Sequence, residues 1–140
     1  MIAFDTNAII RMLVEDDQNQ ANLIKDLISQ VETNSGQILI LTEVLIETVW
    51  VLESSYECTR EEISSFLETL ARTPVFAATE PSVLRAAVSQ YKRGGDFADL
   101  VIVFQAKHFQ AKKLISFDKK LQKKFPDYVV ESIHDGNADL

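Results

Sequence analysis

Two aspartates in this chain each follow a short apolar segment that ends in phenylalanine. Asp5 comes directly after "IAF" and Asp118 directly after "LISF", so the same arrangement occurs twice. Two acidic pairs accompany them, at spacings of four and three residues that place each pair on one face of a helix: Glu43 with Glu47, and Asp96 with Asp99. If these side chains converge, they form an oxygen-only site, which selects a hard divalent cation such as Mg²⁺ or Mn²⁺.

Each acid also has a simpler structural interpretation. Asp and Glu are common near helix N-termini, where they accept hydrogen bonds from free N–H groups and complement the helix dipole. Asp96, Asp118 and Glu43 fit this capping role individually. Glu47 fits it less well, because its sequence neighbours are nearly all apolar, and we expect it to need a partner or a metal.

The apolar periodicity predicts alternating strands and helices that would position these acids. Strands are expected at 2–4, 37–41, near 75–78, at 113–117 and at 128–133, with helices between them. The segment from residue 96 to 113 is ambiguous, because "LVIVF" alone fits a buried strand, but its apolar extension favours a buried helix. Such alternation predicts one α/β domain over residues 1–140, a three-layer α/β/α sandwich with a central, mainly parallel sheet. In such sheets, ligands bind beyond the carboxyl ends of the strands, where the acids fall.

The overall composition is that of a soluble globular protein with a net charge of −7. This charge argues against a general affinity for nucleic acid, but seven of the 14 basic residues fall within residues 107–124. We interpret Lys119, Lys120 and Lys123 as a local RNA-binding rim, and a solvated helix face is the alternative. No segment is apolar and long enough for a membrane span, and without an export signal or cysteine pair we expect a cytoplasmic location.

Four segments of the chain resemble the acidic motifs of PIN-domain ribonucleases, specifically the VapC-like toxins. In order along the chain, they are "FDTNAIIRMLVEDDQNQA", "VLIETVWVLESSY", "GGDFADLVIVFQA" and "LISFDKKL". Each motif alone is weak, but four in the usual order within 140 residues make a strong match. The resemblance implies a metal-dependent endoribonuclease, the toxin of a toxin–antitoxin pair.

The resemblance also implies roles for individual residues. Asp5, Asp99 and Asp118 would hold Mg²⁺ or Mn²⁺, and Glu47 would complete the catalytic set. Residues expected to support them are Thr6, Asn7, Glu43, Asp96 and Ser116, the last at a position where the family often has threonine. The partner from the second acidic helix stays open: Glu47 is indicated by resemblance and Glu43 by position.

The expected partners are an RNA substrate, a cognate antitoxin that blocks the acidic site, and a second copy of the chain. A homodimer is also compatible with the residues themselves, because seven of the nine residues from Val44 to Leu52 are apolar, more than one packed face requires. Two other functions stay possible at this point. One is a Mg²⁺-dependent phosphotransfer domain, although "DTN" lacks the second aspartate of a dehalogenase-type phosphatase. The other is a non-enzymatic interaction module whose acids only cap helices.

Overall fold

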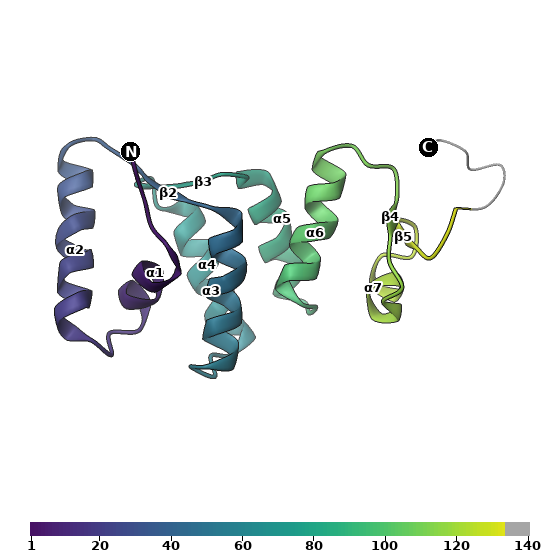
Figure 1. The fold of residues 1–140 in the computed structure, drawn as a ribbon, viewed down its shortest axis with the longest axis horizontal. Coiled ribbons are helices and arrows are strands. Elements are labelled where there is room, and N and C mark those ends of the chain that lie inside the picture. Colours follow the sequence, from purple (N-terminus) through teal and green to yellow (C-terminus); the bar gives the residue numbers. More distant parts are fainter. Residues whose placement is uncertain (134–140) are drawn as a thin grey trace.

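A computed structural model describes residues 1–133, in which strands and helices alternate along the chain (Figure 1). The strands are β1 (Ile2–Ala3), β2 (Ile38–Ile40), β3 (Phe76–Ala78), β4 (Leu114–Ile115) and β5 (Val129–Val130). The helices are α1 (Thr6–Leu13), α2 (Gln18–Thr33), α3 (Thr42–Ser54), α4 (Arg60–Arg72), α5 (Pro81–Tyr91), α6 (Phe97–His108) and α7 (Lys119–Lys124). The ambiguous segment is therefore helical, as its apolar extension predicts. None of the helices in this described part is long and apolar enough to cross a membrane.

All strand pairs are parallel, which confirms the predicted α/β class. The strands are divided between two sheets: one has the order β1-β2-β3, and the other contains β4 and β5. In the first sheet Ile38 is the register partner of both Ile2 and Phe76, and in the second Leu114 lies opposite Val129. Figure 1 shows α5 and α6 between the two sheets along the long axis of the molecule.

The larger hydrophobic core packs the helices against the first sheet. Its fully buried side chains include Ile9, Ile38, Ile40, Leu67 and Leu100. These residues come from β2 and from the helices α1, α4 and α6, so burial of their apolar surface stabilises the packing of these helices on the sheet. The helix that carries Asp99 is fixed to this core through Leu100.

A smaller cluster attaches the second sheet and α7 to α6. Val103 of α6 is buried together with Leu121 and Val129. Beside this cluster the rings of Phe104 and Phe125 lie edge to face, with their centroids 6.0 Å apart. Because α6 contributes to both clusters, it connects the two parts of the molecule.

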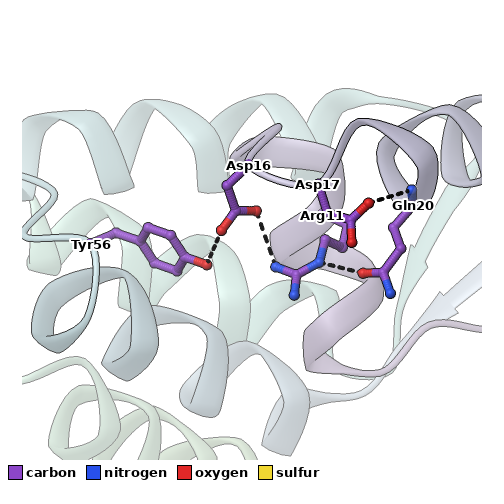
Figure 2. A network of polar contacts seen from close by, with 5 residues as sticks. All are labelled: Arg11, Asp16, Asp17, Gln20 and Tyr56. Atoms are coloured by element: carbon purple, nitrogen blue, oxygen red, sulfur yellow. Dashed lines mark hydrogen bonds and ion pairs between the residues drawn. The ribbon is translucent and has the colours of Figure 1, made fainter.

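A polar network fixes the connection between α1 and α2 (Figure 2). Asp16, in this connection, accepts hydrogen bonds from Arg11 at 3.2 Å and from the hydroxyl of Tyr56 at 3.0 Å. The Asp17 side chain caps α2 by accepting a hydrogen bond from the Gln20 amide at 3.1 Å. Tyr56 follows α3, so the network joins the first two helices to the segment after α3.

Candidate active site

Three of the predicted site aspartates stand at the N-cap of a helix. Asp5 accepts a hydrogen bond from the amide of Ala8 at 3.1 Å, and Asp96 accepts one from the amide of Asp99 at 3.0 Å. Asp118 accepts from two amides of α7, at 2.9 and 3.1 Å. Each cap uses one carboxylate oxygen, and a carboxylate has two. Capping therefore explains why these residues stand where they do, and it leaves the second oxygen available as a ligand.

Asp96, Asp99 and Asp118 lie together on the wall of a cavity of about 540 Å³ between α6 and α7. Partial burial raises the pKa of the Asp99 carboxyl above its ordinary value, and the charges of Asp96 and Asp118 raise it further. The raised pKa of Asp99 means that its negative charge is close enough to those of Asp96 and Asp118 to be repelled by them. The structure thus brings together three acids that are separated by up to 22 positions in the sequence (118 − 96 = 22).

Basic side chains line the same cavity. Lys120 and Lys124 line it from α7, four residues apart and hence on one helix face. Lys119 and Lys123 line a different groove beside β5, where Lys119 forms an ion pair with Glu131. Of the three lysines predicted to bind RNA, only Lys120 therefore lines the cavity that the acids line. Lys124 was not predicted, although its helical spacing from Lys120 could have identified it.

A glycine turn brings Lys124 close to the acidic helix. Gly94 and Gly95 have φ angles of +136° and +106°, which favour glycine because a Cβ is poorly tolerated there. A Cβ on Gly95 would lie 3.1 Å from Cε of Lys124 and 3.4 Å from both terminal methyl groups of Leu100. The turn before Asp96 is therefore shaped both by its backbone conformation and by the lysine that packs over it.

Arg60, at the start of α4, holds this same turn and was also not predicted. Its Nη1 donates hydrogen bonds to the carbonyl oxygens of Tyr91 at 3.0 Å and Gly95 at 2.7 Å. Its guanidinium lies 4.3 Å from the ring centroid of Tyr91, whose hydroxyl donates to Glu53 at 2.8 Å. These contacts fix the loop that places Asp96 and Asp99, because Arg60 binds the backbone on both sides of the turn. Arg60 and Glu53 also line the cavity.

The first acidic motif lies apart from this cavity. Asp5 is exposed at the start of α1 and does not line the cavity. Of the residues expected to support it, Thr6 is buried in the first turn of α1 and Asn7 is exposed. Ser116, by contrast, does contact its expected neighbour, because its hydroxyl oxygen accepts a hydrogen bond from the Asp118 amide at 3.1 Å.

The expectation that Glu47 is surrounded by apolar side chains is wrong. Glu43 and Glu47 both lie on the exposed side of α3, whereas Leu45 and Val49 on the other side are buried in the core. Trp50, one turn further along the helix from Glu47, is also exposed, at 64%. Because Glu47 is exposed, burial supplies no argument for a metal at this position.

The donor chemistry suits a hard divalent ion, but the geometry within one chain is incomplete. Carboxylate oxygens are preferred by Mg²⁺ and Mn²⁺, and the mutual repulsion around Asp99 would be relieved by a cation. Within residues 1–133, however, no three acidic, histidine or cysteine side chains are grouped closely enough to hold a metal ion. Asp5, the expected ligand that follows β1, does not line the cavity, and neither do Glu43 and Glu47.

The parallel α/β architecture with acids after its strands defines the class, and comparison with known proteins identifies the family. Residues 2–125 match the PIN domain model, so the chain belongs to the PIN domain family. It is also 27% identical over 124 residues to a VapC ribonuclease from Aquifex aeolicus (strain VF5), which covers 88% of this chain and 91% of that protein. No solved structure matches the chain significantly. The family expected from the four acidic motifs is confirmed.

Proposed function

We propose that this protein is a metal-dependent endoribonuclease and the toxin of a toxin–antitoxin pair, with a single PIN domain over residues 1–140. The observation that carries the proposal is the cavity that is lined both by Asp96, Asp99 and Asp118 and by Lys120 and Lys124. Hydrolysis of a phosphodiester uses both basic and acidic side chains. Cations bind its charged oxygens, and carboxylates hold the ion that assists its hydrolysis. Membership of the PIN family and similarity to a VapC ribonuclease support the same conclusion.

In this proposal Asp5, Asp99 and Asp118 hold the divalent ion, Mg²⁺ or Mn²⁺, and Glu47 completes the catalytic set. The ion, when bound, supplies Lewis acidity and makes a water molecule a better nucleophile at neutral pH. The carboxylates bind it and accept a proton from the water. Glu43 is the alternative to Glu47, since both are exposed on the same helix.

Other residues keep the ligands in position. Asp96 caps α6 through the amide of Asp99 and so fixes the turn on which Asp99 stands. Ser116 fixes the backbone of Asp118 in the same way. Thr6 and Asn7 directly follow Asp5 on α1, and in the proposal they support it.

The RNA would approach along the lysine side of the cavity. Lys120 and Lys124 bind the phosphates that flank the cleaved bond, because they line the same cavity as the acids. Lys119 and Lys123 lie on another side of α7 and can contact only a more distant part of the RNA strand.

The same acidic cavity offers a site for a protein inhibitor. The net charge of −7 favours a basic partner, since opposite charges speed association. We therefore propose an antitoxin that inserts a basic segment among the aspartates, together with a homodimeric toxin located in the cytoplasm.

Cleavage of RNA by the purified protein tests the proposed activity. Wild type should cut RNA with Mg²⁺ or Mn²⁺ and lose this activity in EDTA, and Asp99→Asn should reduce cleavage at least a hundredfold while keeping the fold. Asp26→Asn, an exposed aspartate on α2, is the matched control and should cut at the wild-type rate. If Asp99→Asn cut as fast as this control, the acids would serve only as helix caps, as in a non-enzymatic interaction module.

A further inference from the structure

A second group of basic residues lies outside the lysine-rich segment 107–124. Of the seven basic residues outside that segment, five fall on α4, on α5 or directly after α5: Arg60, Arg72, Arg85, Lys92 and Arg93. Residues 81–95 contain three of them and no aspartate or glutamate, which gives this stretch a local charge of +3. The net charge of the whole chain is −7, so positive charge is concentrated here against the overall balance.

Three of these residues line a groove between α4 and α5. This α4–α5 groove has a volume of about 270 Å³, and its lining residues are Glu68, Ala71 and Arg72 of α4 with Arg85, Val88, Ser89 and Lys92 of α5 and its C-cap. Arg85, Ser89 and Lys92 are spaced four and three positions apart, which places them on one face of the helix. The groove therefore combines three cations with a single acid.

The single acid does not neutralise the three cations. Glu68 forms an ion pair with Lys92 at 2.7 Å. The hydrogen bond from Lys92 holds the pKa of Glu68 below its ordinary value, and the charge of Arg72 lowers it further. Arg85 is exposed and forms no hydrogen bond or ion pair with any of residues 1–133. Its guanidinium is available to an anion, and the planar fork of this group matches the oxygens of a phosphate.

The α4–α5 groove leads toward the acidic cavity. Arg60 lines the cavity and Ala71 lines the groove, and both lie on the same face of α4, because they are separated by three turns of about 3.6 residues each. On α5, Lys92 of the groove is followed by the turn at Gly94 and Gly95, and Gly95 lines the cavity. Helix α4 thus begins at the cavity and α5 ends at it, with the groove between them.

We propose that the α4–α5 groove binds phosphates of the RNA strand beyond the cleaved bond. This inference rests on the proposed function, because it extends the same substrate from the cavity onto a second surface. Lys120 and Lys124 contact phosphates in the cavity, and Arg72 and Arg85 contact phosphates farther along the strand. The preferred substrate is therefore an RNA that is long enough to reach both surfaces.

An acidic protein segment is the other ligand that a basic groove could take. RNA is favoured for two reasons. The groove leads to a cavity whose acids and lysines suit a phosphodiester. In addition, guanidinium groups bind phosphate through two parallel hydrogen bonds, which gives a phosphate chain a geometric advantage as well as a charge.

The salt dependence of RNA binding tests the groove without reference to cleavage. Binding of a labelled RNA of about 16 nucleotides, a large single-strand site, is measured in EDTA at several salt concentrations. Arg85→Gln should lower the slope of log affinity against log salt by about 0.7, which corresponds to about fourfold weaker binding near 0.15 M salt. Arg85→Lys keeps the charge and should keep the slope.

Lys25→Gln is the matched control. It removes one positive charge from an exposed position on α2, where Lys25 is paired with Glu15, and it should leave the slope nearly unchanged. Circular dichroism confirms that each variant is folded. Equal slopes for Arg85→Gln and Lys25→Gln would overturn the proposal, whether both fell or neither did, because Arg85 would then make no phosphate contact of its own.

The length of the RNA provides a second test, in the presence of Mg²⁺ or Mn²⁺. The double variant Arg72→Gln/Arg85→Gln should cut an RNA of about 16 nucleotides with a kcat/KM about tenfold lower than that of the wild type, and an RNA of about 4 nucleotides equally well. The loss should be in KM rather than kcat, because these contacts form equally in the ground state and the transition state. An equal loss on both RNAs would overturn the proposal.

Two further outcomes separate this inference from its alternatives. A wild type that binds RNA through Arg85 but cuts neither RNA would refute the proposed nuclease and still support the groove as an RNA-binding surface. Poly-glutamate is the probe for an acidic protein ligand. If Arg85→Gln lost affinity for poly-glutamate and kept the wild-type affinity for RNA, the groove would bind an acidic protein and the proposal would be overturned.

Discussion

The arrangement of lysines on α7 makes a quantitative prediction about RNA binding. Lys120 and Lys124 line the cavity with the acids, and Lys119 and Lys123 line a separate groove. Replacing the first two with glutamine should weaken RNA binding. Replacing the second two removes the same charge from the same helix, so this double variant is a matched control.

The expected size of the effect follows from counterion release. For single-stranded nucleic acid, each phosphate contact contributes about 0.7 to the slope of log affinity against log salt. Losing two contacts should lower that slope by about 1.4, which corresponds to about tenfold weaker binding near 0.15 M salt. The control should change the slope by well under half as much, because Lys119 is already paired with Glu131.

Fluorescence anisotropy with a labelled RNA at several salt concentrations measures this slope. The Asp99→Asn background keeps the RNA intact during the titration, and circular dichroism confirms that each variant is folded. Equal slopes for the two double variants would refute the reasoning, because the lysines would then act only through the overall charge of the helix. An unchanged slope in both would mean that α7 is a solvated face.

Two further predictions concern the stability of the site. The pKa of Asp99 is raised in the folded state, so its contribution to stability is present below the ordinary aspartate pKa and is lost as pH rises through the raised value. In EDTA, Asp99→Asn should therefore melt above the wild type near pH 7, with the difference vanishing near pH 3 in thermal scans; a constant difference would contradict this. Arg60→Met removes two hydrogen bonds that hold the turn before Asp96 and should lower the free energy of unfolding by about 1–2 kcal/mol in urea titrations. Arg72→Met, at the other end of α4, should leave it nearly unchanged.

Local structure was largely predictable from the sequence, because it depends on neighbouring residues. The apolar extension of residues 96–113 predicted α6, and Asp96 and Asp118 cap their helices as expected. Glu43 lies in the first turn of α3, whose N-cap is Leu41 without a side-chain hydrogen bond. A cap residue must precede the first apolar turn, and that requirement is visible in the sequence.

Features that depend on contacts between distant segments were less predictable. The expectation for Glu47 failed because α3 has a side that is exposed to solvent, on which even the apolar side chain of Trp50 lies. The role of Arg60 depends on a contact with Gly95, 35 positions away. The strands are also divided between two sheets, with α6 packed between them. Such packing between distant segments cannot be read from a local sequence pattern.

Sequencing of RNA 5′ ends from cells after brief expression tests the central claim most directly, because it samples every RNA and needs no prior choice of substrate. Wild type and Asp99→Asn should be compared at equal protein levels. The proposed endoribonuclease predicts new, discrete 5′ ends with the wild type that are absent with the variant. The same set of 5′ ends in both samples would contradict it.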